Sequence, residues 1–124
     1  MTERWNIHIA RLINLKMTEL RPYQRRLLSD TNEAWNGGAS AVLCVAPTGS
    51  GKTRTMAARA ASWGAPNVAI AHRSELVEQI SIAFAAAGTY HRIIAPDATV
   101  KAISERHRPH APDAPCAVIS VATL

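Results

Sequence analysis

Three short and nearly continuous apolar runs occur along the chain, at residues 40–45, 67–71 and 116–121. Apolar runs of this length without polar alternation are typical of strands that are buried on both faces of a parallel sheet. A fourth, shorter strand is predicted over His91–Ile94. These four segments are the expected strands.

Helical segments are predicted between the strands, over about residues 20–36, 52–63, 74–87 and 97–106. Pro22 suits the first turn of the first helix, and Ser74 is expected to cap the third. The expected stops are glycines, at Gly37-Gly38, Gly64 and Gly88. Strands that alternate with helices predict an α/β fold, with a mostly parallel sheet and helices on both of its faces.

The turn after the first apolar run carries candidate chemistry, in the sequence Ala46-Pro47-Thr48-Gly49-Ser50-Gly51-Lys52-Thr53. A buried strand, a Gly-rich turn and a helix are the context that a phosphate-binding loop requires. The two glycines let the backbone curl so that its N–H groups face an anion, which the helix N-terminus also attracts. A chance Lys-Thr after a Gly-Ser turn is the alternative.

Composition and charge narrow the class of protein. The 124 residues, 48% of them apolar, are enough for about one domain with a core. A net charge of +5 favours anionic partners such as nucleotides and nucleic acid. Cys44 and Cys116 are expected to be buried free thiols. The sequence has no 18-residue apolar run and no signal-peptide pattern, so a cytoplasmic protein without membrane contact is expected.

The order of the motifs resembles the first RecA-like domain of superfamily-two helicases, near the DEAD/DEAH-box and type III restriction-subunit branch. Leu20-Arg21-Pro22-Tyr23-Gln24 resembles the adenine-reading Q motif, and residues 46–53 resemble motif I, which commonly begins with Ala. Residues 72–79 are similar to motif Ia, and residues 119–124 to the motif before the acidic box. The resemblance covers about residues 20–124, with 17–124 as the expected domain and 1–16 as an N-terminal appendage.

The resemblance implies an ATP site, with ATP and Mg²⁺ as the cofactors. The Gln24 amide is expected to read an adenine edge, since it can both donate and accept, although a surface glutamine is the alternative. Lys52 is expected to reach the β- and γ-phosphates, and the Thr53 hydroxyl to ligate Mg²⁺. These two are the candidate catalytic residues. The expected ATP-binding set is Arg21, Tyr23, Gln24, Thr48, Gly49, Ser50, Gly51, Lys52 and Thr53.

A nucleic-acid contact is also implied, with DNA expected rather than RNA. The expected binding residues are His72, Arg73, Ser74 and Thr123. Arg73 lies at a strand end and a helix start, where its side chain and the backbone N–H groups are both available to a phosphate. A solvated surface arginine is the alternative, and Ser74 stands where many relatives have the arginine.

The remaining histidines and carboxylates suggest no further site. His72, His91, His107 and His110 lack a completing Cys or carboxylate pair, and Pro109 argues against a helix that would align the last two. Glu75 and Glu78 are expected on the polar face of a helix.

The sequence contains no Asp-Glu pair, although ATP hydrolysis needs carboxylates for the metal and the attacking water. We therefore expect the ATP-binding fragment of an ATP-dependent DNA helicase or translocase, inactive by itself. A C-terminal part with the acidic box and a second RecA-like domain is expected to be missing. The alternatives are a non-catalytic nucleic-acid-binding module, a small nucleotide kinase and an inactive truncated gene product.

Overall fold

The computed structural model describes residues 20–64, 66–107 and 111–124. The expected appendage, residues 1–16, lies outside the described residues. The elements in chain order are α2 (Pro22–Asn36), α3 (Lys52–Trp63), β1 (Val68–Ala71), α4 (Ser74–Ala86), β2 (His91–Ile94), α5 (Asp97–His107), β3 (Cys116–Ser120) and the 3-10 turn η1 (Val121–Thr123).

The described strands form a three-stranded sheet in the order β1-β3-β2, and both pairs are parallel. Ala71 of β1 pairs with Ser120 of β3, and Ile94 of β2 pairs with Ile119. The carboxyl ends of the three strands therefore meet at one edge of the sheet. The predicted α/β class with a mostly parallel sheet is confirmed.

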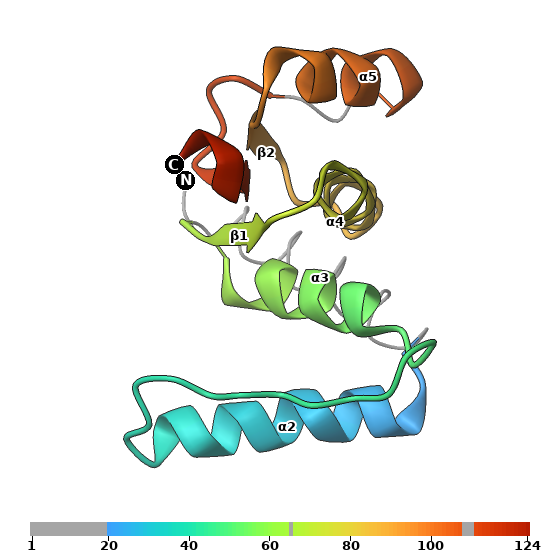
Figure 1. Cartoon of the computed structure of the whole chain (residues 1–124). Coiled ribbons are helices and arrows are strands. Elements are labelled where there is room, and N and C mark those ends of the chain that lie inside the picture. Colours follow the sequence, from blue (N-terminus) through green and yellow to red (C-terminus); the bar gives the residue numbers. More distant parts are fainter. Residues whose placement is uncertain (1–19, 65, 108–110) are drawn as a thin grey trace.

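Helix α4 carries the packing of the core. It contacts all three strands as well as α3 and α5 (Figure 1). Val77 of α4, Ile103 of α5 and Val118 of β3 are fully buried where these elements meet. Removing such side chains from water is the main force that holds these layers together.

The glycine stops have the predicted positions. Gly64 directly follows α3, and Gly88 lies just beyond α4, and both have φ values in the left-handed region, at 84° and 82°. Pro22 is the first residue of α2, as expected. The predicted cap at Ser74 is wrong. Arg73 is the N-cap, and the Ser74 hydroxyl lies 3.1 Å from that of Thr99 at the start of α5.

The prediction of a strand over residues 40–45 is also wrong, because these residues form no strand. Residues 41–46, which we call the strap, are part of no strand pair in the described sheet and run along α2 (Figure 1). Leu43 and Val45 are 88% and 82% exposed. A strand needs a neighbour for its backbone groups, and the three described strands pair among themselves.

The strap also changes the expected burial of the cysteines. Cys44 lies in the strap and is exposed, so its predicted burial is wrong. Cys116 begins β3 and is buried, as predicted. Both thiols are free. At the outer edge of the sheet, Val68 and Ile70 of β1 are also more than half exposed.

His91 is a core residue that joins β2 to α4. Its Nδ1 lies 2.9 Å from the Thr89 carbonyl oxygen, which can only accept, so Nδ1 carries a proton and donates it. In the neutral ring Nε2 then accepts from the Ser81 hydroxyl at 2.7 Å. Ser81 and His91 are both fully buried, so this histidine is part of the packing.

The exposure of the strap gives a direct test by unfolding. Leu43→Ala is expected to change the free energy of unfolding by less than about 0.5 kcal/mol, because that side chain is already in water. Phe84→Ala in the core is expected to cost about 3–5 kcal/mol. Urea titrations measure both. A loss of 2 kcal/mol or more for Leu43→Ala would show that the strap is buried in solution.

Candidate functional site

The turn before α3 has the backbone of an anion-binding loop. Gly49 and Gly51 have φ values of 79° and 82°, in the left-handed region that other residues rarely adopt. The Ser50 N–H donates to the Pro47 carbonyl oxygen at 3.2 Å, which closes the turn. Gly51 is the N-cap of α3, so the loop leads directly into the helix.

The surroundings of this loop suit a phosphate group. The first N–H groups of α3 have no acceptor within the helix, and the first turn contains no acidic residue. The Lys52 side chain is exposed, while that of Thr53 is half-buried. The Ser50 hydroxyl is buried and has no hydrogen-bond partner among the described residues. Because an anion would accept from all these donors, the residues present fit a nucleotide phosphate.

Gln24 is bonded to this loop. Its Nε2 donates to the Gly51 carbonyl oxygen at 3.0 Å, and its Oε1 accepts from the Arg21 N–H at 2.8 Å. The same Gly51 oxygen accepts from the N–H and the hydroxyl of Thr55, each at 3.0 Å. The start of α2, the loop and the first turn of α3 therefore meet at one carbonyl oxygen.

This contact leaves no room for a side chain at residue 51 as long as Gln24 stays in place. A Cβ atom there would lie 2.5 Å from Gln24 Nε2 and 3.9 Å from the Tyr23 hydroxyl oxygen. Gln24 is only 2% exposed, whereas Arg21 and Tyr23 remain exposed beside it. Sequence reasoning predicted the glycine for its conformation but did not predict this close approach.

Arg59 is a residue of this region that sequence reasoning missed. Its Nη1 donates to Asn32 Oδ1 at 2.7 Å, and its Nη2 to the Leu28 carbonyl oxygen at 2.5 Å and to Thr31 Oγ1 at 2.8 Å. The guanidinium also lies 5.4 Å from the centre of the Trp35 ring. Partial burial lowers the pKa of Arg59, and the nearby Cys44 acts in the opposite direction. An available signal was its place seven residues after Lys52, on the same face of α3.

A cavity of about 350 Å³ lies between α2, α3 and the strap, next to the loop. Its lining is mostly apolar but includes the two cations Lys52 and Arg59. From the strap, Val42, Cys44 and Ala46 line it, whereas the intervening Leu43 and Val45 are exposed to solvent. The strap is therefore extended, with alternate residues on each side.

The predicted nucleic-acid residues lie at the carboxyl edge of the sheet. His72 and Arg73 follow β1 directly and are exposed. Ser74 and Thr123 already have hydrogen-bond partners. The Ser74 hydroxyl is bonded to that of Thr99. The Thr123 hydroxyl donates to the carbonyl oxygens of Ile94 and Ser120, at 3.0 and 2.8 Å. A phosphate can only accept, so a bond from Thr123 to it would require the hydroxyl to leave these partners.

The loop lies at the same end of the molecule. Helix α3 ends where the chain turns into β1, so its N-terminus is at the carboxyl end of that strand (Figure 1). Helices α3 and α4 pack against each other. Their two N-termini, with Lys52 and Arg73, are therefore at one end.

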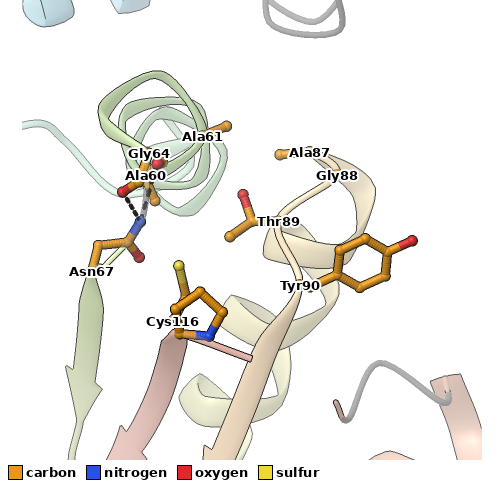
Figure 2. Close-up of a pocket in the computed structure, with 10 residues that line it drawn as sticks. Ala60, Ala61, Gly64, Asn67, Ala87, Gly88, Thr89, Tyr90 and Cys116 are labelled. Carbon is orange, nitrogen blue, oxygen red and sulfur yellow. Dashed lines mark hydrogen bonds between the residues drawn. The ribbon is translucent and has the colours of Figure 1, made fainter. Parts of the chain in front are cut away.

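A second cavity, of about 200 Å³, lies at the opposite edge, where the strands begin (Figure 2). On one side of this cavity, the Asn67 amide nitrogen donates to the carbonyl oxygens of Ala60 and Gly64, at 3.1 and 2.9 Å. Tyr90 points away from the group in this view. None of the predicted site residues lines this cavity.

Other classes of site find no support in the residues that the structure describes. Among them, no three His, Cys, Asp or Glu residues are grouped so that they could hold a metal ion. Glu78 forms an ion pair with Arg106 at 3.0 Å. Within the same part of the chain, every helix is too short or too polar to cross a membrane.

The close approach at Gly51 can be tested against a matched glycine. Gly88→Ala has the same φ of 82° and open space around the new methyl group, so it is expected to cost about 1 kcal/mol of stability. Gly51→Ala must also displace Gln24, which is expected to add about 1–3 kcal/mol. Urea unfolding measures both, and equal losses would show that Gln24 does not contact the loop in solution.

Comparison with known proteins places the chain in a family. A family model described as "Type III restriction enzyme, res subunit" matches residues 17–124. No curated protein and no solved structure matches the chain. The parallel α/β sheet agrees with an incomplete RecA-like fold, as the resemblance implied. The chain therefore belongs to the family of type III restriction enzyme res subunits, a helicase-like and ATP-dependent family.

Proposed function

We propose that this chain binds ATP with Mg²⁺ at the loop before α3. The observation that carries the proposal is the bond from Gln24 to the Gly51 carbonyl oxygen, because it unites a candidate base-reading residue with a phosphate-binding loop. The residues that hold the phosphates are Thr48, Gly49, Ser50, Gly51, Lys52 and Thr53. Backbone N–H groups bind the phosphate oxygens, and Lys52 adds a point charge.

Mg²⁺ held by the Thr53 hydroxyl and the phosphates would neutralise charge on the triphosphate. The chain's own residues orient the phosphate chain and shield its charge. The buried Ser50 hydroxyl, which has no partner among the described residues, is a further donor for a phosphate oxygen.

Gln24 keeps one amide N–H and one carbonyl lone pair beyond the two bonds described above. An adenine edge offers one acceptor and one donor to match them. Because Gln24 is only 2% exposed, a base reaches it only by displacing neighbouring side chains. Arg21 and Tyr23, both exposed, are the neighbours that we assign to the base.

Turnover is not expected from these 124 residues, since they contain no Asp-Glu pair to hold the metal and orient water. The chain is proposed as the ATP-binding part of an ATP-dependent DNA helicase or translocase. Steady ATP hydrolysis by the purified chain that Lys52→Ala abolishes would contradict this proposal.

The same end of the molecule is proposed to contact the DNA backbone. His72 and Arg73 are exposed there. Arg73 occupies the N-cap position of α4, where the first N–H groups of the helix are available to a phosphate. Ser74 and Thr123 are proposed as neighbouring contacts, which for Thr123 requires its hydroxyl to leave the carbonyl oxygens of Ile94 and Ser120. The net charge of +5 favours this partner.

Lys52 gives the test of ATP binding. Lys52→Ala is expected to raise the Kd for MgATP about 10- to 100-fold, since it removes one charge-assisted contact. Lys101→Ala removes the same charge from the exposed surface of α5 and is the matched control. Calorimetric titration measures both. No binding by the unaltered chain, or equal affinities for the two variants, would leave a non-catalytic nucleic-acid module or an inactive product as the function.

Arg73 gives the test of DNA binding. Arg73→Ala is expected to weaken binding to DNA and to lower the slope of log K against log salt concentration by about 1. Arg92→Ala, on the exposed side of β2, removes the same charge away from this end. Fluorescence anisotropy of labelled DNA between low and moderate salt measures both. Identical slopes for the two variants would exclude Arg73 as a phosphate contact.

A further inference from the structure

Helix α2 is attached to the rest of the molecule mainly by polar side chains. Its buried residues are Gln24, Leu28 and Thr31, only one of which is apolar. Leu28 belongs to a small cluster with Leu20 and Ala58, apart from the main core. Since a cavity of about 350 Å³ also separates α2 from α3, apolar packing alone fixes α2 weakly.

Arg59 supplies several of the remaining contacts. It contacts four positions of α2, namely Leu28, Thr31, Asn32 and Trp35. The Trp35 ring also meets Trp63 of α3 edge to face, at 5.3 Å between ring centres. Arg59 therefore holds one face of α2 against α3 over about two turns.

Gln24 lies on that same face. It precedes Leu28 by four residues, or about one turn, so a rotation of α2 that breaks the Arg59 contacts also moves Gln24 away from Gly51. The three Arg59 hydrogen bonds at one end of this face and the Gln24 hydrogen bond at the other are therefore expected to break together.

We infer that Arg59 is a positioning residue, which keeps Gln24 on the Gly51 carbonyl and thereby gives the nucleotide site its preference for adenine. The preference rests on the proposed ATP binding, whereas the effect on Gln24 does not. Arg59 is not among the residues that we assign to the phosphates or to the base. It acts through α2.

An arginine suits this position better than a lysine. Its planar fork presents several N–H groups in fixed directions, and here two of its nitrogens reach three acceptors on successive turns of α2. Its guanidinium carbon also lies over the Trp35 ring. An ammonium group keeps the charge but cannot make all these contacts together.

The first experiment observes Gln24 in the nucleotide-free chain. The side-chain amide signals of Gln24 are identified in a ¹H–¹⁵N spectrum by their loss in Gln24→Ala. Arg59→Met is expected to shift them to the position of a solvent-exposed amide, and Arg59→Lys to shift them part of the way. Arg26→Met, which removes an exposed arginine of α2, is the control and is expected to leave them unchanged.

Gln24 signals that stay in place in folded Arg59→Met would overturn the inference. If Arg59→Met does not fold, Arg59→Lys decides in the same way, since it keeps the charge and the stem. Both results are obtained without nucleotide, so they hold whether or not the chain binds ATP.

The second experiment compares the affinities for MgATP and MgGTP. Arg59→Met is expected to lower the preference for ATP about five- to tenfold, the effect of one lost hydrogen bond, and to the same level as Gln24→Ala. The double variant is expected to lose no more of the preference for ATP than either single variant, because both changes disrupt the same contact between Gln24 and Gly51. Additive losses would show that Arg59 acts independently of Gln24. If the unaltered chain binds neither nucleotide, the proposed function fails, and the spectrum alone decides whether Arg59 positions Gln24.

Discussion

The carbonyl oxygen of Gly51 is the point on which the candidate site depends. It closes the first turn of α3 by accepting from the Thr55 N–H, and it also accepts from the Thr55 hydroxyl and from Gln24. Three donors at one oxygen fix the start of a helix, the end of a loop and the start of a second helix together. Only glycine allows this approach, since a Cβ atom would lie within 2.5 Å of the Gln24 amide nitrogen.

The parallel sheet decides which other residues join this point. Because all three strands run in one direction, each helix that precedes or follows a strand begins or ends at a defined edge. Lys52 and Arg73 begin neighbouring helices at the carboxyl edge, whereas Asn67 and Cys116 lie at the opposite edge, with a cavity free of predicted site residues. Topology thus gathers cationic donors at one end of the molecule.

Local signals predicted most of the fold. The strands over 67–71, 91–94 and 116–121 form within a residue or so of their predicted bounds, because short apolar runs between turn residues have few other stable conformations. The run over 40–45 has the same composition but forms no strand, since pairing depends on a neighbour that a local pattern does not contain. The predicted burial of Cys44 was wrong for the same reason.

The arrangement of residues in the candidate site was predicted only in part, because it too depends on partners that are distant in the sequence. The glycines and Lys52 follow from the loop sequence, but the roles of Arg59 and Ser74 depend on partners 25 to 31 residues away. Periodicity places a residue on a face of a helix and leaves its partner undefined.

The unpaired strap has a thermodynamic consequence for the loop that follows it. A strand in a sheet would hold the entry of such a loop with ladder hydrogen bonds. Here only the exit is held, by the helical hydrogen bond from the Thr55 N–H to the Gly51 carbonyl oxygen. Backbone without such bonds opens locally at low cost, and ordering one residue of it costs about 1–2 kcal/mol of entropy. If the loop binds an anion as proposed, each residue of the strap that becomes ordered on binding is expected to lower the affinity by about tenfold.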